Sequence, residues 1–102
     1  MIHLLAFITA HPGQRAALLD AFHGIVPTVH AEDGCIEYAP VVDIDGFEGF
    51  TTALGPDTYA VVEKWASAEA LRKHATAPHM EDYNQRVSSM IARRVLHVLK
   101  AG

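Results

Sequence analysis

Glu63, Trp65 and His74 lie close together in the sequence and are the side chains best suited to chemistry on a small molecule. Histidine is the side chain most often used as a general base, so His74 is the first candidate for a catalytic base or for the partner of an oxyanion. Trp65 could stack on an aromatic ring or donate its indole N–H. Glu63 could orient a histidine or a hydroxyl group. We therefore predict these three as catalytic residues.

Each of these residues also has an ordinary structural explanation. A histidine at a helix C-terminus stabilises the helix end, which would account for His74. A tryptophan in an apolar strand is commonly part of the core, and Glu63 could pair with an Arg or Lys at a subunit interface. Both explanations stay open at the level of sequence.

The segment from Thr58 to Met80 must position the three candidates. Its alternation of β-branched and aromatic residues predicts a strand from Tyr59 to Trp65, with the carboxylate and the indole on one face. Ser67 is a suitable N-cap for a short helix that should run to about Ala75. This helix would carry His74 in its last turn.

Further aromatic and imidazole side chains are candidates for substrate binding. Pro78 suits the first position of another helix, on which His79 and Tyr83 are spaced i and i+4 and could reach a pocket together. Phe22 belongs to the apolar stripe of the first helix, and Tyr38 belongs to a strand. A surface position for His79 and simple core packing for the aromatic residues are the alternatives.

Four other histidines form no recognisable metal motif. His3, His23, His30 and His97 do not complete a zinc spacing with an obvious third ligand, so we expect no metal site. Cys35 has no CxxC partner and should be inert.

The rest of the chain supplies further elements in a simple order. We predict a strand at residues 2–10, a helix at 14–30 ended by the Glu32-Asp33-Gly34 segment, a strand at 35–44, a helix from 78 to about 91 and a strand at 93–100. The order β-α-β-β-α-α-β predicts an α+β fold of the ferredoxin-like type, with one antiparallel sheet and helices on one face. A length of 102 residues fits a single domain, 1–102.

The segment Asp45 to Asp57 is rich in glycine and acids, yet it carries Phe47, Phe50 and Leu54. It is either the extended tip of a hairpin or a loop whose aromatic residues cover a pocket. The composition alone is compatible with both.

The predicted sheet has apolar residues on both faces. The last strand, for example, has apolar residues at both odd and even positions, namely Val95, Leu96, Val98 and Leu99. If helices cover only one face, the other face would expose apolar side chains to solvent in a monomer. We therefore expect a homodimer that packs sheet against sheet.

Composition narrows the possible partners. A net charge of −4 with only eight Lys and Arg residues argues against binding to nucleic acid or to an anionic membrane. On the same ground, Arg93 and Arg94 are expected to be solvated charges at the start of a strand. No apolar run is long enough for a membrane span, and the N-terminal segment lacks the charged region of a signal peptide. With a single cysteine, these features predict a cytoplasmic protein.

Several sequence strings resemble the antibiotic biosynthesis monooxygenase family of small dimeric α+β barrels. The core of the resemblance is Glu63-x-Trp65 followed by Ser67-x-x-x-Leu71-x-x-His74 on the predicted element order. The strings IVPTV at 25–29, DGCIEYAPVVD at 33–43 and TAPHMEDY at 76–83 are similar to the bacterial quinol monooxygenases of that family. The resemblance covers nearly the whole chain.

The resemblance implies oxidation or oxygenation of quinols or other electron-rich phenols by dioxygen, without flavin, metal or haem. Such chemistry needs a dry pocket, a base for the phenolic proton and donors for the oxyanion. The expected partners are thus a small aromatic or quinone-like substrate, dioxygen and a second copy of the chain. His74 is the candidate for the base.

Three alternatives remain. Haem-degrading members of the family use an amide side chain on the first strand, but that strand reads HLLAFITA here. A non-catalytic dimer that binds small aromatic molecules, for example in a stress response, is compatible with the same residues. An isomerase acting on a phosphorylated sugar would need basic side chains that bind the phosphate, and the candidate residues do not provide them.

Overall fold

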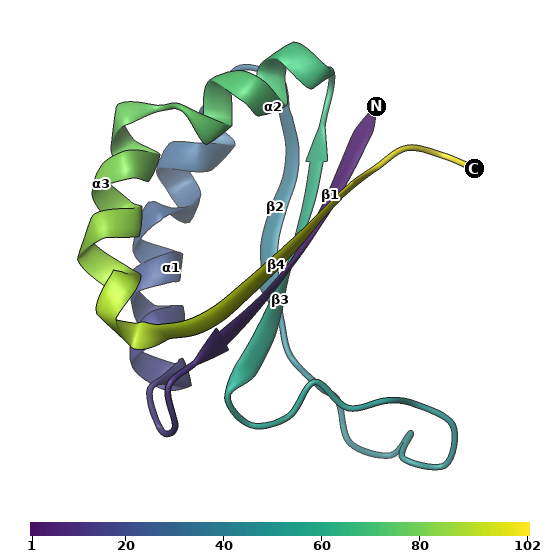
Figure 1. Ribbon diagram of the computed structural model, residues 1–102. Helices are drawn as coiled ribbons and strands as arrows, with labels where there is room; N and C mark the ends of the chain where they lie inside the picture. The colour runs from purple at the N-terminus through teal and green to yellow at the C-terminus, as the bar shows by residue number, and fades with distance from the viewer.

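The computed structural model describes residues 1–102, and its architecture confirms the predicted α+β fold. The elements are, in order, β1 (Ile2–Ala10), α1 (Arg15–His30), β2 (Cys35–Val41), β3 (Thr58–Trp65), α2 (Ala68–Ala75), α3 (Pro78–Val87), a 3-10 turn (Ser88–Met90) and β4 (Ile91–Leu99). The strands form one antiparallel sheet in the order β2-β3-β1-β4. All three α-helices lie on one side of it (Figure 1).

The central strands β1 and β3 fix the inner face of the sheet. Leu4, Ala6 and Ile8 of β1 are buried, and they stand opposite Glu63, Val61 and Tyr59 of β3 in the strand pairing. Because side chains alternate along a strand, this register turns every second residue of β3 toward the helices. Glu63 and Trp65 thus share the inner face, as predicted from the alternation.

The helices cover this face with their apolar stripes. Helix α1 buries Leu18, Phe22, Ile25 and Val29. The side chain of Ser67 accepts the Ala70 N–H and caps α2, and Pro78 begins α3 after Ala77. The predicted starts and the predicted end of α2 are confirmed, and His74 lies in its last turn.

Helix α1 ends at His30 as predicted, and the Glu32 N–H bonds to Val29 O just beyond it. Three other predicted boundaries were wrong. Strand β2 ends at Val41 instead of Ile44. Helix α3 ends at Val87, and a 3-10 turn leads directly into β4 at Ile91.

The turn between α1 and β2 packs tightly against α2. Gly34 has φ +82, and a Cβ at this position would lie only 2.6 Å from the Ala70 Cβ. Glycine is therefore required both for the backbone conformation and for the close approach. This contact brings the turn at Glu32 beside α2.

The segment between β2 and β3 projects away from the body of the protein (Figure 1). The carboxylate of Asp43 accepts the N–H groups of Leu54 and Gly55 and closes the loop at its base. Phe47 and Phe50 pack edge to face at its tip and remain exposed. They do not line the main cavity of their own chain.

The face of the sheet opposite the helices has no covering layer (Figure 1). Leu5, Phe7 and Val62 lie there half-buried, and Leu99 is 44% exposed. On the inner face, Leu96 and Val98 of the edge strand β4 are also exposed. None of the helices is both long and apolar enough to cross a membrane.

Candidate active site

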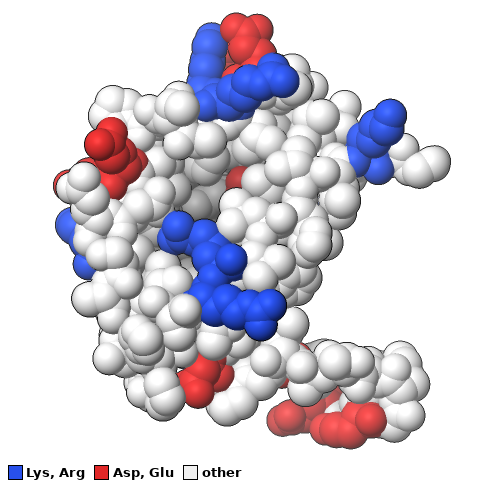
Figure 2. Space-filling view, viewed as in Figure 1, with Lys and Arg blue, Asp and Glu red and all other residues white.

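A cavity of about 220 Å³ lies between the inner face of the sheet and helices α2 and α3. The hollow is visible in Figure 2, with Lys or Arg side chains at its rim and an acidic side chain inside. Most of its lining is apolar, and its polar members are Glu63, His74, Asn84 and Arg94 together with tyrosine hydroxyls. For comparison, a dry cavity of about 150 Å³ accepts benzene, so this cavity suits a one-ring or compact two-ring aromatic molecule.

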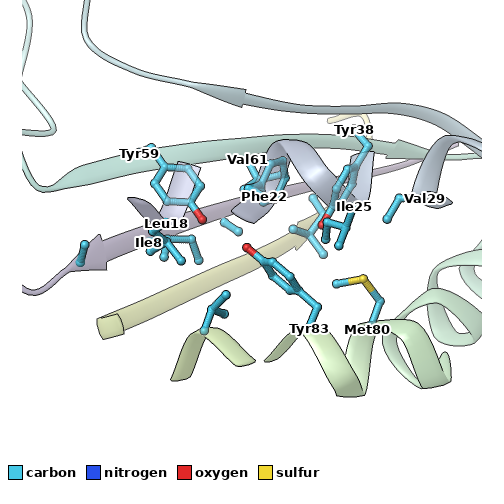
Figure 3. Close-up of a cluster of buried hydrophobic side chains, with 14 of the residues drawn as sticks. Ile8, Leu18, Phe22, Ile25, Val29, Tyr38, Tyr59, Val61, Met80 and Tyr83 are labelled. Atoms are coloured by element: carbon cyan, nitrogen blue, oxygen red, sulfur yellow. The ribbon is translucent and has the colours of Figure 1, made fainter. Parts of the chain in front are cut away.

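Aromatic side chains form much of the wall. The rings of Phe22 and Tyr38 stack with centroids 5.0 Å apart and an interplanar angle of 14°. Tyr59 and Tyr83 approach Phe22 edge-on, with centroids 5.9 and 6.4 Å away. Figure 3 shows these rings converging from β2, β3, α1 and α3. The structure thus brings the predicted binding residues Phe22, Tyr38 and Tyr83 to one cavity.

His74 lies between two carboxylates. It is 6% exposed, its Nδ1 is 2.8 Å from Glu32 Oε2, and its Nε2 is 3.9 Å from Glu63 Oε1. His74 and Glu63 line the cavity, whereas Glu32 does not. The Nε2 edge of the ring therefore belongs to the cavity side, and the Nδ1 edge faces the turn after α1.

Trp65 contacts both Glu63 and His74. It is completely buried, its indole N–H donates to Glu63 Oε1 over 3.0 Å, and its ring lies 4.6 Å from that of His74. Trp65 is absent from the cavity lining. Of its two predicted roles, the structure thus provides the N–H donation, but to Glu63, and it does not place the indole where it could stack on a ligand.

Burial changes the acid–base behaviour of the site. Desolvation raises the pKa of Glu63, although the Trp65 hydrogen bond and the His74 ring partly offset the effect. Desolvation also raises the pKa values of Tyr38, Tyr59 and Tyr83. The three phenols therefore remain neutral hydroxyl groups at neutral pH, able to donate hydrogen bonds.

The hydroxyl of Tyr83 is buried without a hydrogen-bond partner. It points toward the hydroxyl of Tyr59 in the cavity wall (Figure 3), but the two groups do not form a hydrogen bond of normal geometry. A buried hydroxyl without a partner costs about 1–3 kcal/mol. Tyr83 is thus a donor available to an oxygen atom of a ligand.

His79 does not join Tyr83 in the cavity lining. Its Nε2 lies 3.0 Å from Glu32 Oε2, and its side chain is 35% exposed. The first turn of α3 lies beside the turn that follows α1, which explains this contact. The expectation that His79 and Tyr83 reach the pocket together is therefore wrong for His79.

Two charged residues of the site, Glu32 and Arg94, are not among the candidates that the sequence indicates. The sequence places Glu32 in a helix stop and predicts Arg94 as a solvated charge. Arg94 lines the cavity, since its pairing with Ile8 places it on the inner face of the sheet. The alternation of β4 could have indicated this, whereas nothing local marks Glu32 as a partner of His74.

Glu32, His74 and His79 together offer a donor set that metal sites use, with ligand atoms within 4.8 Å of one another. Glu32 Oε2 lies at hydrogen-bond distance from both rings, 2.8 and 3.0 Å, which satisfies the carboxylate and both imidazoles without an ion. A zinc ion would need all three atoms within about 2.2 Å of one point. The cluster is thus arranged as a hydrogen-bonded group.

Comparison with known proteins agrees with this architecture. The sequence model described as "Antibiotic biosynthesis monooxygenase" matches residues 1–86. The chain is 38% identical over 104 aligned positions to the Escherichia coli protein named "Probable quinol monooxygenase YgiN", covering 100% of this chain and 99% of that protein. The solved structure of Rv0793 from Mycobacterium tuberculosis superposes with a TM-score of 0.79 at 25% identity, covering 98% and 93% of the two chains. PA3566 from Pseudomonas aeruginosa has the same fold, with a TM-score of 0.79 at 23% identity and coverage of 98% and 92%. On this evidence the protein is a member of the antibiotic biosynthesis monooxygenase family.

Proposed function

We propose that the cavity binds a quinol or a related electron-rich phenol and that the protein promotes its oxidation by dioxygen without flavin, metal or haem. Membership of a monooxygenase family and the similarity to a protein named as a probable quinol monooxygenase support the reaction class. The observation that carries the proposal is His74, a buried imidazole whose Nε2 edge faces an aromatic-lined cavity.

The first step is removal of a phenolic proton by His74 Nε2. The resulting imidazolium lies between the carboxyl groups of Glu32 and Glu63, which favour its charge. Tyr83 can donate its free hydroxyl to a substrate oxygen, and Arg94 adds a fixed positive charge at the cavity lining. Deprotonation makes the substrate electron-rich enough to reduce dioxygen itself.

The overall reaction balances in two ways. In simple oxidation, the quinol gives two electrons and two protons to dioxygen, and the products are a quinone and hydrogen peroxide. In mono-oxygenation, one oxygen atom enters the ring and the other leaves as water, and the product is a hydroxyquinone. The substrate supplies all the electrons, two in simple oxidation and four in mono-oxygenation, so no external reductant is needed.

The size of the cavity argues against the haem-degrading alternative. At about 220 Å³ the cavity is smaller than the range of about 300–1,000 Å³ that holds drug-sized ligands, and haem is larger than these.

The test is dioxygen uptake by chelator-treated, colourless protein with a panel of reduced naphthoquinones and polyphenols. We expect turnover by the parent protein and a loss of at least about tenfold in kcat/KM for His74→Gln, because a positioned base contributes about 10²- to 10⁴-fold. Lys73→Gln, on the exposed side of the same helix, is the matched control.

Two outcomes would overturn the proposal. Activity that appears only after a flavin, metal or haem is added would refute the cofactor-free mechanism. Binding of quinones in the cavity without any dioxygen uptake would instead favour a non-catalytic binding protein, which remains the second candidate because the aromatic lining serves binding equally well.

We further propose that the protein is a homodimer through the face of the sheet opposite the helices. The half-buried Leu5, Phe7 and Val62 and the exposed Leu99 make this face apolar, and a second copy of the chain would cover it symmetrically.

A further inference from the structure

We propose that Glu32 is a positioning residue that holds His74 in the Nδ1–H tautomer and thereby keeps Nε2 unprotonated toward the cavity. The role assigned to Nε2 rests on the proposed function above, whereas the tautomer itself is a property of the resting protein.

The geometry at Nδ1 determines the tautomer. Glu32 Oε2 lies 2.8 Å from His74 Nδ1, a normal hydrogen-bond distance, and a carboxylate can only accept. The proton of the neutral ring must therefore be on Nδ1. At the other edge, the 3.9 Å between Nε2 and Glu63 Oε1 is too long for a hydrogen bond that would favour a proton on Nε2.

Glu32 is itself held firmly in place. Its side chain is only 14% exposed, and the same Oε2 atom lies 3.0 Å from His79 Nε2. The close approach of Gly34 to Ala70 anchors the turn that carries Glu32 against α2. The carboxylate is thus restrained from two helices and from its own turn, as a group that orients a catalytic ring should be.

Glu32 acts on the reaction only through His74. It does not line the cavity, so it cannot touch a bound substrate. When Nε2 accepts a proton, the negative charge at Nδ1 stabilises the imidazolium, and the fixed ring orientation keeps Nε2 directed at the substrate. Loss of the carboxylate should therefore lower kcat and leave substrate binding nearly unchanged.

The test combines a spectroscopic and a kinetic readout. The protein is labelled with ¹⁵N-histidine, and the His74 signals are assigned by their loss in His74→Gln. Above the titration range of the ring, we expect the parent protein to show a protonated Nδ1 and an unprotonated Nε2. In Glu32→Gln, whose amide can donate to Nδ1, the Nδ1–H form should lose its predominance.

We expect Glu32→Gln to lower kcat about 10- to 100-fold, the usual effect of removing such a partner, with KM changed less than about twofold. Glu69→Gln on the exposed face of α2 should change neither the spectrum nor the rate. Glu32→Asp should restore part of the Nδ1–H signal, because it keeps a carboxylate.

The results separate this inference from the proposed function. An Nε2–H tautomer in the parent protein would overturn the inference even if Glu32→Gln failed to fold. An unchanged His74 spectrum and rate in folded Glu32→Gln would overturn it as well. If the parent protein shows the Nδ1–H form but oxidises no quinol, the proposed function fails and the positioning role of Glu32 stands.

Discussion

Replacement of Glu63 by Gln should make the stability of the protein less dependent on pH. Glu63 is 6% exposed, accepts a single hydrogen bond from Trp65 and has no Lys or Arg partner. Its carboxylate is therefore poorly compensated for the loss of water, and burial raises its pKa above the ordinary value of 4.5. The folded state holds this proton more tightly than the unfolded state.

The sign of the effect follows from this difference. As pH rises from about 4.5 through the raised pKa, the unfolded chain loses the proton first, so the free energy of unfolding falls. Below this pH range, ionisation of Glu63 does not affect the free energy of unfolding. Above it, the buried carboxylate lowers the free energy of unfolding by its full amount. Each unit by which the pKa is raised costs about 1.4 kcal/mol at high pH. A change of about 1 kcal/mol shifts Tm by about 4–8 °C in a domain of this size.

Glu63→Gln removes the titrating group but keeps an oxygen that can accept the Trp65 N–H. The stability of the variant relative to the parent should therefore increase as pH is raised from about 4.5 through the raised pKa of Glu63, and should then level off. Denaturant unfolding at a fixed protein concentration measures both proteins across this range. A constant offset from the amide itself does not matter, because only the change with pH is compared.

Glu37→Gln is the matched control. Glu37 lies on the same sheet, but its carboxylate is 40% exposed and 3.5 Å from Lys64 Nζ. This control should parallel the parent protein. If the difference between Glu63→Gln and the parent is the same at every pH, Glu63 ionises with an ordinary pKa, and the desolvation argument is refuted.

Three further outcomes are expected. Tyr83→Phe removes a buried hydroxyl that has no partner, so the ligand-free variant should be as stable as the parent or up to about 3 kcal/mol more stable. The same change should weaken quinone binding about 2- to 10-fold. A clear loss of stability in a melting experiment would contradict this. Arg94→Gln should raise KM for quinols, less so at high salt, and an unchanged KM would exclude Arg94 from the site. Light scattering at micromolar concentration should give a dimer mass that Val95→Asp, on the outer face of β4, reduces to a monomer; a monomeric parent protein would refute the proposed interface.

The sequence alone determined the elements and their faces. Local rules of alternation and capping are enough to place Glu63 and Trp65 on one side of β3, to cap α2 at Ser67 and to begin α3 at Pro78. The element order then determined the ferredoxin-like fold. Boundaries such as the end of α3 were misplaced, because a 3-10 turn at Ser88–Met90 replaces the last turn of the predicted helix.

Only the tertiary structure decided which side chains meet. Glu32 and His74 are 42 residues apart, and their contact depends on the packing of the Gly34 turn against Ala70 of α2. His79 likewise contacts Glu32 and does not line the cavity. Sequence periodicity describes which face of one element a residue occupies, but contacts between elements depend on how the elements pack. The sequence therefore could not predict that His74 pairs with Glu32, nor the direction in which His74 Nε2 faces.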